Sequence, residues 1–351
     1  STFIKYASIN SNYSNNFLSR NYIGYLDNSG QGWYDLAHSI SPNNIDEMWI
    51  GGINTWKTDD GGASFDLSNF WYHEQSGNPA TPTPANAYPI VHADKHFYAY
   101  HPLDANTFLE CNDGGIYFTQ DGGTTWIDIS SGLGIGQIYR IGVASNIADN
   151  VITGLQDNGT KEYVNNLWYE HPPGGDGMEC IIDHSNPSTE YCTVMNGMIL
   201  KTYNSWSNFQ LVGCTGQGGM ICLNGGTGNT GVNSAGSWIT PYLMHPTDPN
   251  ILIIGKNQVY KTTNQGINNN FTQISNFSFP TTPAGNYDTL IKSMAYAPSN
   301  PQYIYIANQY NLYSTSNGGS SWSPPSPSNN NDQISDVIVD PNNPLRVVIT
   351  K

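Results

Sequence analysis

The sequence predicts an all-β fold, a single seven-bladed β-propeller whose ring is closed by a blade shared between the two termini. Two turns that recur along the chain support this prediction, and no stretch shows a convincing helical period. Seven repeats in 351 residues average about 50 residues each, which is the size of a four-stranded blade with its loops.

The first repeated turn is rich in Pro, Asn and Asp and separates short apolar segments. Its seven copies are at 41–44, 101–104, 145–149, 183–187, 245–249, 297–301 and 340–344. These residue types fix φ or bond to their own backbone, so they favour links between strands. The β-branched and aromatic runs at 46–50, 250–254 and 302–306 are therefore expected to be strands.

The second repeated turn follows the first by about 18–20 residues in six of the seven repeats. Clear copies lie at 58–65, 119–126 and 315–322, a degraded copy at 262–266, and vestiges at 165–168 and 203–206. The clear copies read Ser/Thr-x-Asp/Asn-x-Gly-x-Ser/Thr-Trp/Phe. This pattern resembles the Asp-box, or bacterial neuraminidase repeat, of sialidases, xyloglucanase-type glycosidases, sortilin-like receptors and a photosystem assembly factor. The resemblance implies a β-propeller with these turns on the rim away from the ligand face.

A structural role is expected for the residues that define this second turn. The acidic or amide side chain can accept bonds from N–H groups of its own turn, the Gly supplies a positive φ, and the final aromatic ring packs between sheets. The residues concerned are Asp60, Asp121, Asn264, Asn317, Trp126 and Trp322.

Residues 1–351 are expected to form one domain. The turn at Pro341 has no second turn after it, whereas 27–33 is a box-like turn with no first turn before it. The simplest interpretation is that residues 1–40 complete the blade begun at 334–351, which removes exposed sheet edges. The alternative is a fragment whose tail was lost, and both can hold.

The five cysteines do not make a disulfide scaffold. Cys214 and Cys222 lie in a Gly-rich stretch and could close a small ring. If residues 184–189 form a hairpin loop, Cys180 and Cys192 point to opposite faces of that hairpin, so no bridge is expected between them.

The charge balance argues against several classes of partner. Twelve Lys and Arg stand against 27 Asp and Glu, a formal net charge of −15, and only 11% of residues are charged. Such a surface repels phosphate backbones and anionic lipid, so no nucleic acid partner and no membrane insertion are expected. Low charge with abundant Asn, Tyr, Ser and Gly is typical of extracellular or bacterial cell-surface proteins.

Three residues spaced two apart form the first candidate site. His92, Asp94 and His96 would share one face of a strand. Two imidazoles and a carboxylate in a row suit a metal half-site, an acid/base cluster or ligand binding. The alternative is a polar strand that lines a solvated channel.

The second candidate site combines two acidic turns. Asp157 and Asp176 are each expected where a blade's entry strand begins, and Gln156 and Asn158, which flank Asp157, are expected to bind ligand. Two carboxylates facing each other across a cleft are what glycoside hydrolysis needs. The alternatives are two Asx-type turns, or a site for calcium or another divalent cation. No cofactor is required by either interpretation.

Taken together, these motifs resemble those of secreted bacterial Asp-box propellers. The chain contains His92-x-Asp94-x-His96, then Asn112-Asp113-Gly114-Gly115, and then the turns at 156–159 and 174–178. Such proteins are common in Bacteroidetes, where many are exported by type IX secretion and labelled glycosyl hydrolase-like. The resemblance implies fold and export route more than any reaction.

Two reactions can be weighed on the sequence. Sialidases clamp a carboxylate with three arginines, and this chain has only Arg20, Arg140 and Arg346. A xyloglucanase-like hydrolase needs two carboxylates and an aromatic groove, for which Trp71 and Tyr72 are the best candidates for an exposed patch. The alternative is that these rings pack in the core. The sequence therefore predicts a module that binds a glycan or a protein partner, such as secretion or cell-surface machinery, on its loop face. The alternative is a glycoside hydrolase that uses Asp157 and Asp176 with support from Asp94.

Overall fold

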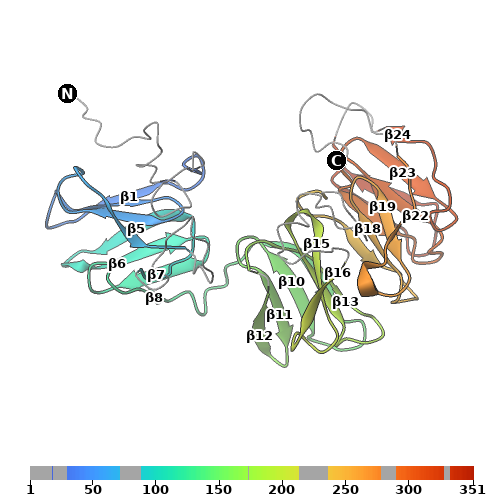
Figure 1. Cartoon of the computed structure of the whole chain (residues 1–351), viewed down its shortest axis with the longest axis horizontal. Coiled ribbons are helices and arrows are strands. Elements are labelled where there is room, and N and C mark those ends of the chain that lie inside the picture. The colour runs from blue at the N-terminus through green and yellow to red at the C-terminus, as the bar shows by residue number, and fades with distance from the viewer. Residues whose placement is uncertain are drawn as a thin grey trace. The chain divides into compact units, whose positions relative to one another are not determined.

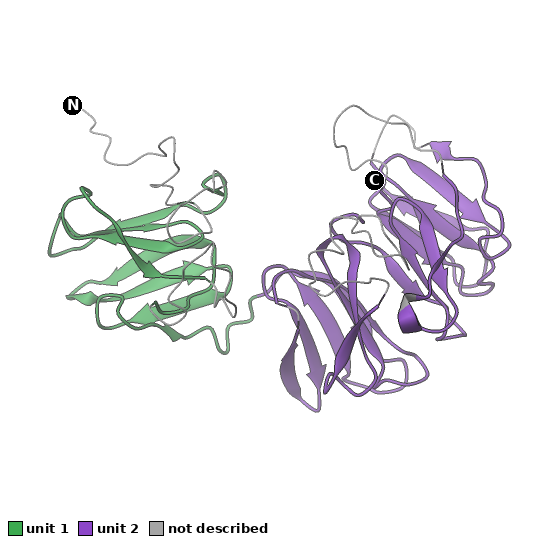
Figure 2. Cartoon of the chain, in the orientation of Figure 1, with its two compact units in different colours: residues 1–135 green, residues 136–351 purple. Residues whose placement is uncertain are grey.

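The computed structural model describes residues 18, 30–71, 88–172, 174–212, 236–277, 290–327 and 333–351. Within these ranges the chain is all-β, with no α-helix and two short 3₁₀ turns at Met195–Gly197 and Ile267–Asn269. The all-β prediction is thus confirmed. The chain divides into two compact units, unit 1 (residues 1–135) and unit 2 (residues 136–351) (Figure 2).

Unit 1 contains two four-stranded antiparallel sheets, each with its strands in chain order. The first sheet consists of β1 (Ala37–Ile40), β2 (Met48–Gly51), β3 (Thr55–Thr58) and β4 (Asp66–Asn69). The second consists of β5 (Lys95–His101), β6 (Asp104–Asn112), β7 (Gly115–Thr119) and β8 (Ile127–Asp128) (Figure 1). Ala37, Trp49, Tyr98 and Phe108 form a buried apolar cluster that joins the two sheets.

Unit 2 contains four four-stranded sheets and one of two strands. The third sheet consists of β9 (Ile138–Val143), β10 (Val151–Leu155), β11 (Thr160–Val164) and β12 (Leu167–His171). The fourth consists of β13 (Gly177–Ile182), β14 (Glu190–Val194), β15 (Met198–Thr202) and β16 (Phe209–Val212). The fifth sheet consists of β17 (Tyr242–Met244), β18 (Leu252–Gly255), β19 (Val259–Thr262) and β20 (Thr272–Gln273). The sixth consists of β21 (Ser293–Tyr296), β22 (Ile304–Ala307), β23 (Asn311–Thr315) and β24 (Ser326–Pro327). The last sheet is β25 (Asp336–Val339) and β26 (Val347–Thr350).

Successive sheets of unit 2 share apolar cores. One cluster joins the third and fourth sheets through Ile152 and Leu200, and the next joins the fourth and fifth through Ile199 and Leu252. Two further clusters continue this pattern to the sixth and last sheets. The fourth, fifth and sixth sheets therefore bury both of their faces against neighbours, as the blades of a propeller do.

The two repeated turns occupy fixed places in this architecture. All seven Pro/Asn turns link the first and second strands of a sheet, and the second type links the third and fourth strands. The three strands expected from the sequence are confirmed as β2, β18 and β22, each beginning two residues later than expected.

The seven-bladed closed ring stays a prediction. Six sheets have four strands, and the last has two. The expectation that residues 1–40 complete this last sheet needs one correction, because 37–40 pair with β2 in the first sheet. Residues 1–17 and 19–29, on which closure depends, lie outside the described residues.

The second turn has a repeated set of hydrogen bonds. In the copy that follows β7, Thr119 Oγ1 accepts from the N–H of Gly123 at 2.9 Å and donates to Asp121 Oδ1 at 2.9 Å. Asp121 in turn accepts from the N–H and the hydroxyl of Thr125 at 2.9 and 2.7 Å. These bonds to the Asp121 carboxylate lower its pKa.

The same bonds recur in the other copies. Asp60, Asn317 and Asn264 each accept from the hydroxyl of the Thr two positions before them at 2.8 Å. The turn at 203–206, expected as a vestige, has the bonds of Thr202 and the backbone N–H bond of Asn208 to Asn204, without the hydroxyl bond that Thr125 makes to Asp121. Residues 165–166 instead form a two-residue hairpin, with φ of 53° and 64°, and are not a copy of the turn.

The aromatic rings that end two of these turns pack between sheets. Trp126 contacts Phe108 edge-to-face at 5.3 Å, next to the core that joins the two sheets of unit 1. Trp322 donates from Nε1 to the Ile274 carbonyl at 2.8 Å, which links the sixth sheet to the fifth.

Replacing Thr119 by Val should test the contribution of this bond pattern. Val keeps the shape of the buried side chain but leaves the N–H of Gly123 without its acceptor, so we expect a loss of about 1–3 kcal/mol in the free energy of unfolding. Chemical denaturation of the full chain measures this. Thr124→Val, on an exposed side chain of the same turn, should cost less than about 1 kcal/mol; equal losses in the two variants would contradict the assignment.

The hairpin of Cys180 and Cys192 corrects one expectation. The two cysteines are direct partners in the β13–β14 register, so they share a face instead of pointing to opposite faces. The expected register, with Asp183 opposite Glu190, was one residue off. In the structure the N–H of Asp183 bonds to the Thr189 carbonyl at 2.9 Å, so Glu190 pairs with Ile182. Both thiols are buried and free, while Cys214 and Cys222 lie outside the described residues.

Candidate functional site

In unit 1 the candidate residues lie at the strand ends opposite the repeated turns. β3 and β7 run toward the turns at 59–64 and 120–125, so their first residues, Thr55 and Gly115, mark the other end of each sheet. Hairpin 112–115 and segment 91–94, which leads into β5, lie at this end. We call it the loop end of unit 1.

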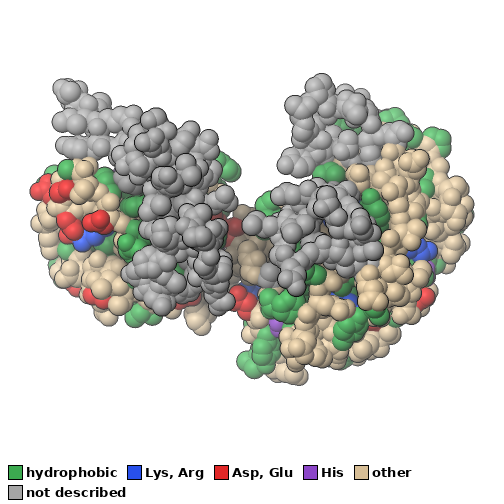
Figure 3. Space-filling model, in the orientation of Figure 1, with side chains coloured by type: hydrophobic (Ala, Val, Ile, Leu, Met, Phe, Trp, Pro, Cys, Tyr) green, Lys and Arg blue, Asp and Glu red, His purple; other side chains and the backbone are tan. Residues whose placement is uncertain are grey.

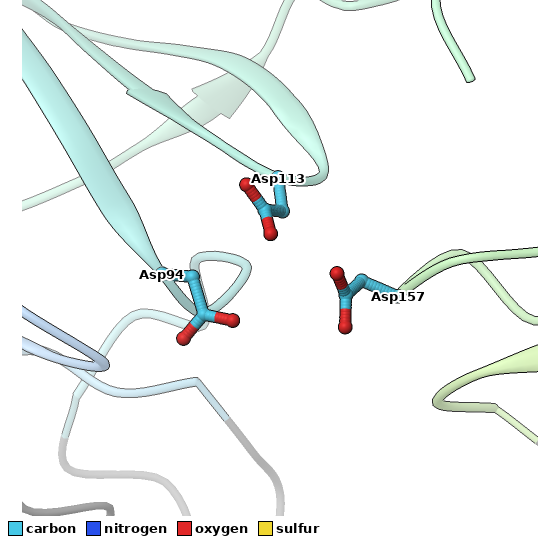
Figure 4. Close-up of side chains that lie close together, drawn as sticks. All are labelled: Asp94, Asp113 and Asp157. Atoms are coloured by element: carbon cyan, nitrogen blue, oxygen red, sulfur yellow. The ribbon is translucent and has the colours of Figure 1, made fainter. Parts of the chain in front are cut away.

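Two carboxyl groups approach each other at the loop end, and a third lies against one of them. Asp94 and Asp113 each offer a carboxylate oxygen, and these atoms lie within 4.8 Å of each other. Figure 4 shows the two side chains extending from separate loops toward the same space. The Asp35 carboxyl lies against that of Asp94 and is fully buried. We call Asp35, Asp94 and Asp113 the carboxylate cluster.

The expected strand of His92, Asp94 and His96 is wrong in its geometry. β5 begins only at Lys95, and Asp94 has a φ of 63°, so the chain turns between the two histidines. The register also shifts between Lys95 and Phe97. His92 and His96 therefore do not share a strand face, although both remain near the cluster.

Each histidine has its own partner. His96 Nε2 lies 2.6 Å from Asp113 Oδ1, and its ring meets the Tyr34 ring edge-on at 5.1 Å. The Tyr34 hydroxyl donates to the other Asp113 oxygen at 2.7 Å. His92 Nδ1 lies 3.2 Å from the carbonyl of Ala93.

Burial and mutual repulsion act on the carboxyl groups of the cluster. Burial, followed by the neighbouring Asp35 charge, raises the pKa of Asp94 to about 6. Burial also raises the pKa of Asp35. Gln31 stabilises the pair by donating from Nε2 to Asp94 Oδ1 at 2.7 Å.

A buried ion pair connects the two sheets that hold the cluster. Lys95 Nζ lies 3.3 Å from Glu110 Oε1, and both side chains are fully buried. The other Glu110 oxygen accepts from Thr55 Oγ1 at 2.7 Å and from Asn69 Nδ2 at 2.9 Å. This network ties β5 and β6 to β3 and β4, and so fixes the two sheets that hold the cluster.

Aromatic side chains also lie at the loop end of unit 1, and one of them, Tyr34, contacts the cluster through Asp113. Trp33 is 85% exposed and Tyr34 41% exposed, with their ring centroids 5.8 Å apart. Trp71, just after β4, is 37% exposed, and its N–H donates to Asn54 Oδ1 at 3.2 Å. Tyr72, the other half of the expected patch, lies outside the described residues.

In unit 2 the two acidic turns are neighbours. The N–H of Asp157 donates to Asp176 Oδ1 at 3.1 Å, and the N–H of Gly159 donates to the Gly175 carbonyl at 2.7 Å. Asp157, at a φ of 56° and also drawn in Figure 4, lies in the β10–β11 turn, not before an entry strand as expected. Asp176 does precede the first strand of its sheet, β13.

Close packing of the backbone holds these two turns together. A Cβ on Gly154 would lie 2.1 Å from the Met178 carbonyl oxygen, and one on Gly177 would lie 2.1 Å from the Gly159 carbonyl oxygen. Only glycine permits this approach of β10 to β13. Nearby, Asn158 Nδ2 donates to the Gln156 carbonyl at 3.0 Å, which shapes the turn locally.

Unit 2 also has a groove of about 900 Å³ between its fifth and sixth sheets. Phe277, Tyr313 and Trp322 line it, with Pro324 and Pro325 at one side. The three aromatic rings pack on one another. The ring centroid of Phe277 lies 4.5 Å from that of Tyr313 and 5.3 Å from that of Trp322. The rings thus serve the core between the sheets as well as the groove.

The surface is weakly charged. On the face viewed in Figure 3, most of the described surface belongs to neither acidic nor basic side chains. No helix among the described residues is long and apolar enough to span a membrane.

Sequence reasoning missed part of the carboxylate cluster. Asp113 was singled out only within the motif 112–115, while Asp35, Gln31 and Tyr34 carried no signal of their own. They approach the cluster only through the pairing of distant segments, since 63 positions separate Gln31 from Asp94.

Comparison with solved structures finds β-propeller proteins at low sequence identity. Sqt1 from Saccharomyces cerevisiae matches with a TM-score of 0.43 and 11% identity, over 88% of this chain and 78% of that one. YCF48 from Cyanidioschyzon merolae matches with a TM-score of 0.40 and 10% identity, over 90% and 92% of the two chains. An ancestral GH74 enzyme matches with a TM-score of 0.30 and 14% identity, over 88% of this chain but only 33% of that one. No protein-family model and no curated protein sequence matches the chain.

Proposed function

We propose that the protein is an extracellular or cell-surface binding module, and that it binds a neutral glycan at the loop end of unit 1. The observation that carries this proposal is Trp33, whose ring is 85% exposed beside the hydrogen-bonded Tyr34–Asp113–His96 group. Leaving so large an apolar ring in water gains nothing for folding, and sugar faces stack on such rings.

The polar groups beside these rings suit sugar hydroxyls. Carboxylate and amide oxygens of Asp113, Asp94 and Gln31 can accept hydrogen bonds that orient a ligand lying on the aromatic surface. A neutral ligand is favoured because the chain carries a net charge of −15. The two described arginines, Arg140 and Arg346, pair with Glu179 and Asp340, which leaves an anionic sugar few basic contacts.

The hydrolase alternative stays a prediction for Asp157 and Asp176. One Asp176 oxygen already accepts the N–H of Asp157, which gives this carboxylate a role in turn structure. A binding module is therefore the function that the described contacts favour.

Calorimetric titration with neutral β-glucan and xyloglucan oligosaccharides, and with a sialoside, tests the proposal. We expect one of the neutral glycans to bind and Trp33→Ala to weaken it about fivefold or more, since a stacked ring contributes about 1–3 kcal/mol at such sites. Trp168→Ala is the matched control, because Trp168 is also exposed (59%) but lies in unit 2.

Mass spectrometry of the glycans after incubation separates binding from hydrolysis. Intact glycans and a selective effect of Trp33→Ala support the proposal. Equal affinities in wild type and Trp33→Ala, or preferential binding of the sialoside, would refute it.

A further inference from the structure

Two buried cysteines of the fourth sheet face each other across the hairpin that β13 and β14 form. Cys180 and Cys192 are direct partners in its register, and both belong to the apolar cluster that joins the third and fourth sheets. Cys180 is 3% exposed and Cys192 is fully buried. Cys111, on β6, belongs to unit 1, so among the described cysteines these are the two that the fold brings together.

The hydrogen bonds of this hairpin show how closely the two cysteines approach. The N–H of Asp183 donates to the Thr189 carbonyl, so these two residues form a hydrogen-bonded pair. Such pairs alternate with non-hydrogen-bonded pairs along an antiparallel ladder, which makes Cys180 and Cys192 a non-hydrogen-bonded pair. At such a pair the Cα atoms lie about 4.5 Å apart and the side chains are closest. This separation falls within the range of about 4.4–6.8 Å that is usual for a disulfide.

Each of the two thiols makes a weak contact with a backbone carbonyl. Cys180 Sγ lies 3.5 Å from the Met178 carbonyl oxygen, and Cys192 Sγ lies 3.8 Å from that of Pro172. Because a thiol is a weak donor, turning the two sulfur atoms toward each other sacrifices little hydrogen bonding. A disulfide has no polar hydrogen, so it also suits the apolar side chains of the surrounding cluster.

We infer that Cys180 and Cys192 form a disulfide bond when the chain folds in an oxidising compartment. The thiolate of one cysteine attacks a disulfide oxidant, such as the active-site disulfide of an oxidoreductase, forms a mixed disulfide and releases one oxidant thiolate. The thiolate of the other cysteine then attacks the cysteine sulfur of that mixed disulfide and releases the second. The two cysteines lose two electrons and two protons in all, and the oxidant gains them. This bond rests on the extracellular location proposed above, and it is independent of glycan binding.

The bond is expected to form early in folding, because the turn of this hairpin is held by local contacts. Asp183 Oδ1 accepts from the N–H of Ser185 at 2.7 Å and of Asn186 at 3.2 Å. The N–H of Thr189 donates to the Asn186 carbonyl at 2.9 Å. A hairpin stabilised in this way brings the cysteines together before the third sheet covers them. In the folded chain burial raises the pKa of Cys192 to about 12, so few thiolates are present and later oxidation is slow.

Disulfide mapping of the full chain tests the inference. Wild type is secreted into the bacterial periplasm and unfolded without reductant in the presence of an alkylating reagent, so that only free thiols react. Cleavage after Glu190 separates the two cysteines. Mass spectrometry should then find the peptides of Cys180 and Cys192 still joined and Cys111 alkylated. In protein made in the reducing cytoplasm, Cys180 and Cys192 should both be alkylated.

Two variants separate this bond from other effects of secretion. The bond should raise the Tm of secreted wild type by about 5 °C over that of the cytoplasmic protein, because a cross-link restricts the unfolded chain. Cys192→Ala should abolish this difference and leave Cys180 alkylated, whereas Cys111→Ala should retain both the bond and the difference. The mapping of wild type needs no variant, so it remains decisive if Cys192→Ala does not fold.

Three results would overturn the inference: alkylation of both Cys180 and Cys192 in folded, secreted wild type, joining of Cys180 to a different cysteine, or an undiminished Tm difference in Cys192→Ala. Because the experiment itself imposes secretion, any of them would refute the bond without bearing on the proposed location or on glycan binding.

Discussion

Replacing Lys95 by Met is expected to destabilise unit 1 by about 3–5 kcal/mol, since it leaves a buried charge without its partner. Lys95 and Glu110 are both fully buried and 3.3 Å apart. Burial lowers the pKa of Lys95, and the Glu110 charge opposes that shift. Met fills a similar volume, so the predicted loss comes from the unpaired Glu110 carboxylate and not from a cavity.

Thermal unfolding and hydrogen exchange measure this effect. A loss of this size should lower the Tm of the unfolding of unit 1 by on the order of 10 °C or more, and exchange should rise first in β3–β7. The double variant Lys95→Met, Glu110→Gln should recover part of the loss, because the neutral Gln keeps an acceptor for Thr55 and Asn69. A single variant within 2 °C of wild type, or a double variant no better than the single one, would contradict the role given to the ion pair.

The parts of this fold that sequence predicts well are those encoded locally. In the turn after β7, every hydrogen bond that the structure describes for the Thr119 and Asp121 side chains reaches a residue no more than four positions away. Residue spacing alone therefore specifies the turn, and it predicts the structural role of Asp60, Asp121, Asn264 and Asn317. The Pro/Asn turns are local in the same way.

Strand register and contacts between distant residues cannot be predicted from local spacing in this way. The hairpin of Cys180 and Cys192 was placed one residue off because nothing in the sequence shows that Asp183 and Thr189 are still bonded across the loop. A single step of register moves each side chain to the other face of a sheet. The strand expected through His92, Asp94 and His96 failed because of the positive φ at Asp94, and Asp35 meets Asp94 only through the fold.

A second buried carboxyl group should make the stability of unit 2 depend on pH. Glu190 is fully buried, with one oxygen accepting from Trp206 Nε1 and the other without a partner. Burial, and then the nearby Glu162 charge, raises the pKa of Glu190 to about 8, from an ordinary value of 4.5. The contacts of His171 are with Glu162, whose Oε2 lies 2.6 Å from its Nε2, and with the Trp206 ring, on which it stacks at 5.0 Å.

The sign of the effect follows from proton binding. Between about pH 4.5 and 8 the folded state holds the Glu190 proton while the unfolded state releases it, so the stabilisation is present at low pH and is lost as pH rises through this window. Each pKa unit corresponds to about 1.4 kcal/mol, so the difference across the window is expected to approach about 4 kcal/mol. Glu179, whose pKa burial raises to about 7, adds a slope of the same sign.

Denaturation of wild type and Glu190→Gln at pH 5.5 and 8.5 measures this contribution. Wild type should be clearly less stable at pH 8.5, and Glu190→Gln should reduce that difference by about half or more, because an amide accepts the Trp206 bond without a charge. Glu179 should contribute to the slope that remains. Glu170→Gln, on an exposed carboxylate that pairs with Lys161, should retain the wild-type dependence; the same slope in wild type and Glu190→Gln would show that Glu190 is ionised in the folded protein throughout this range.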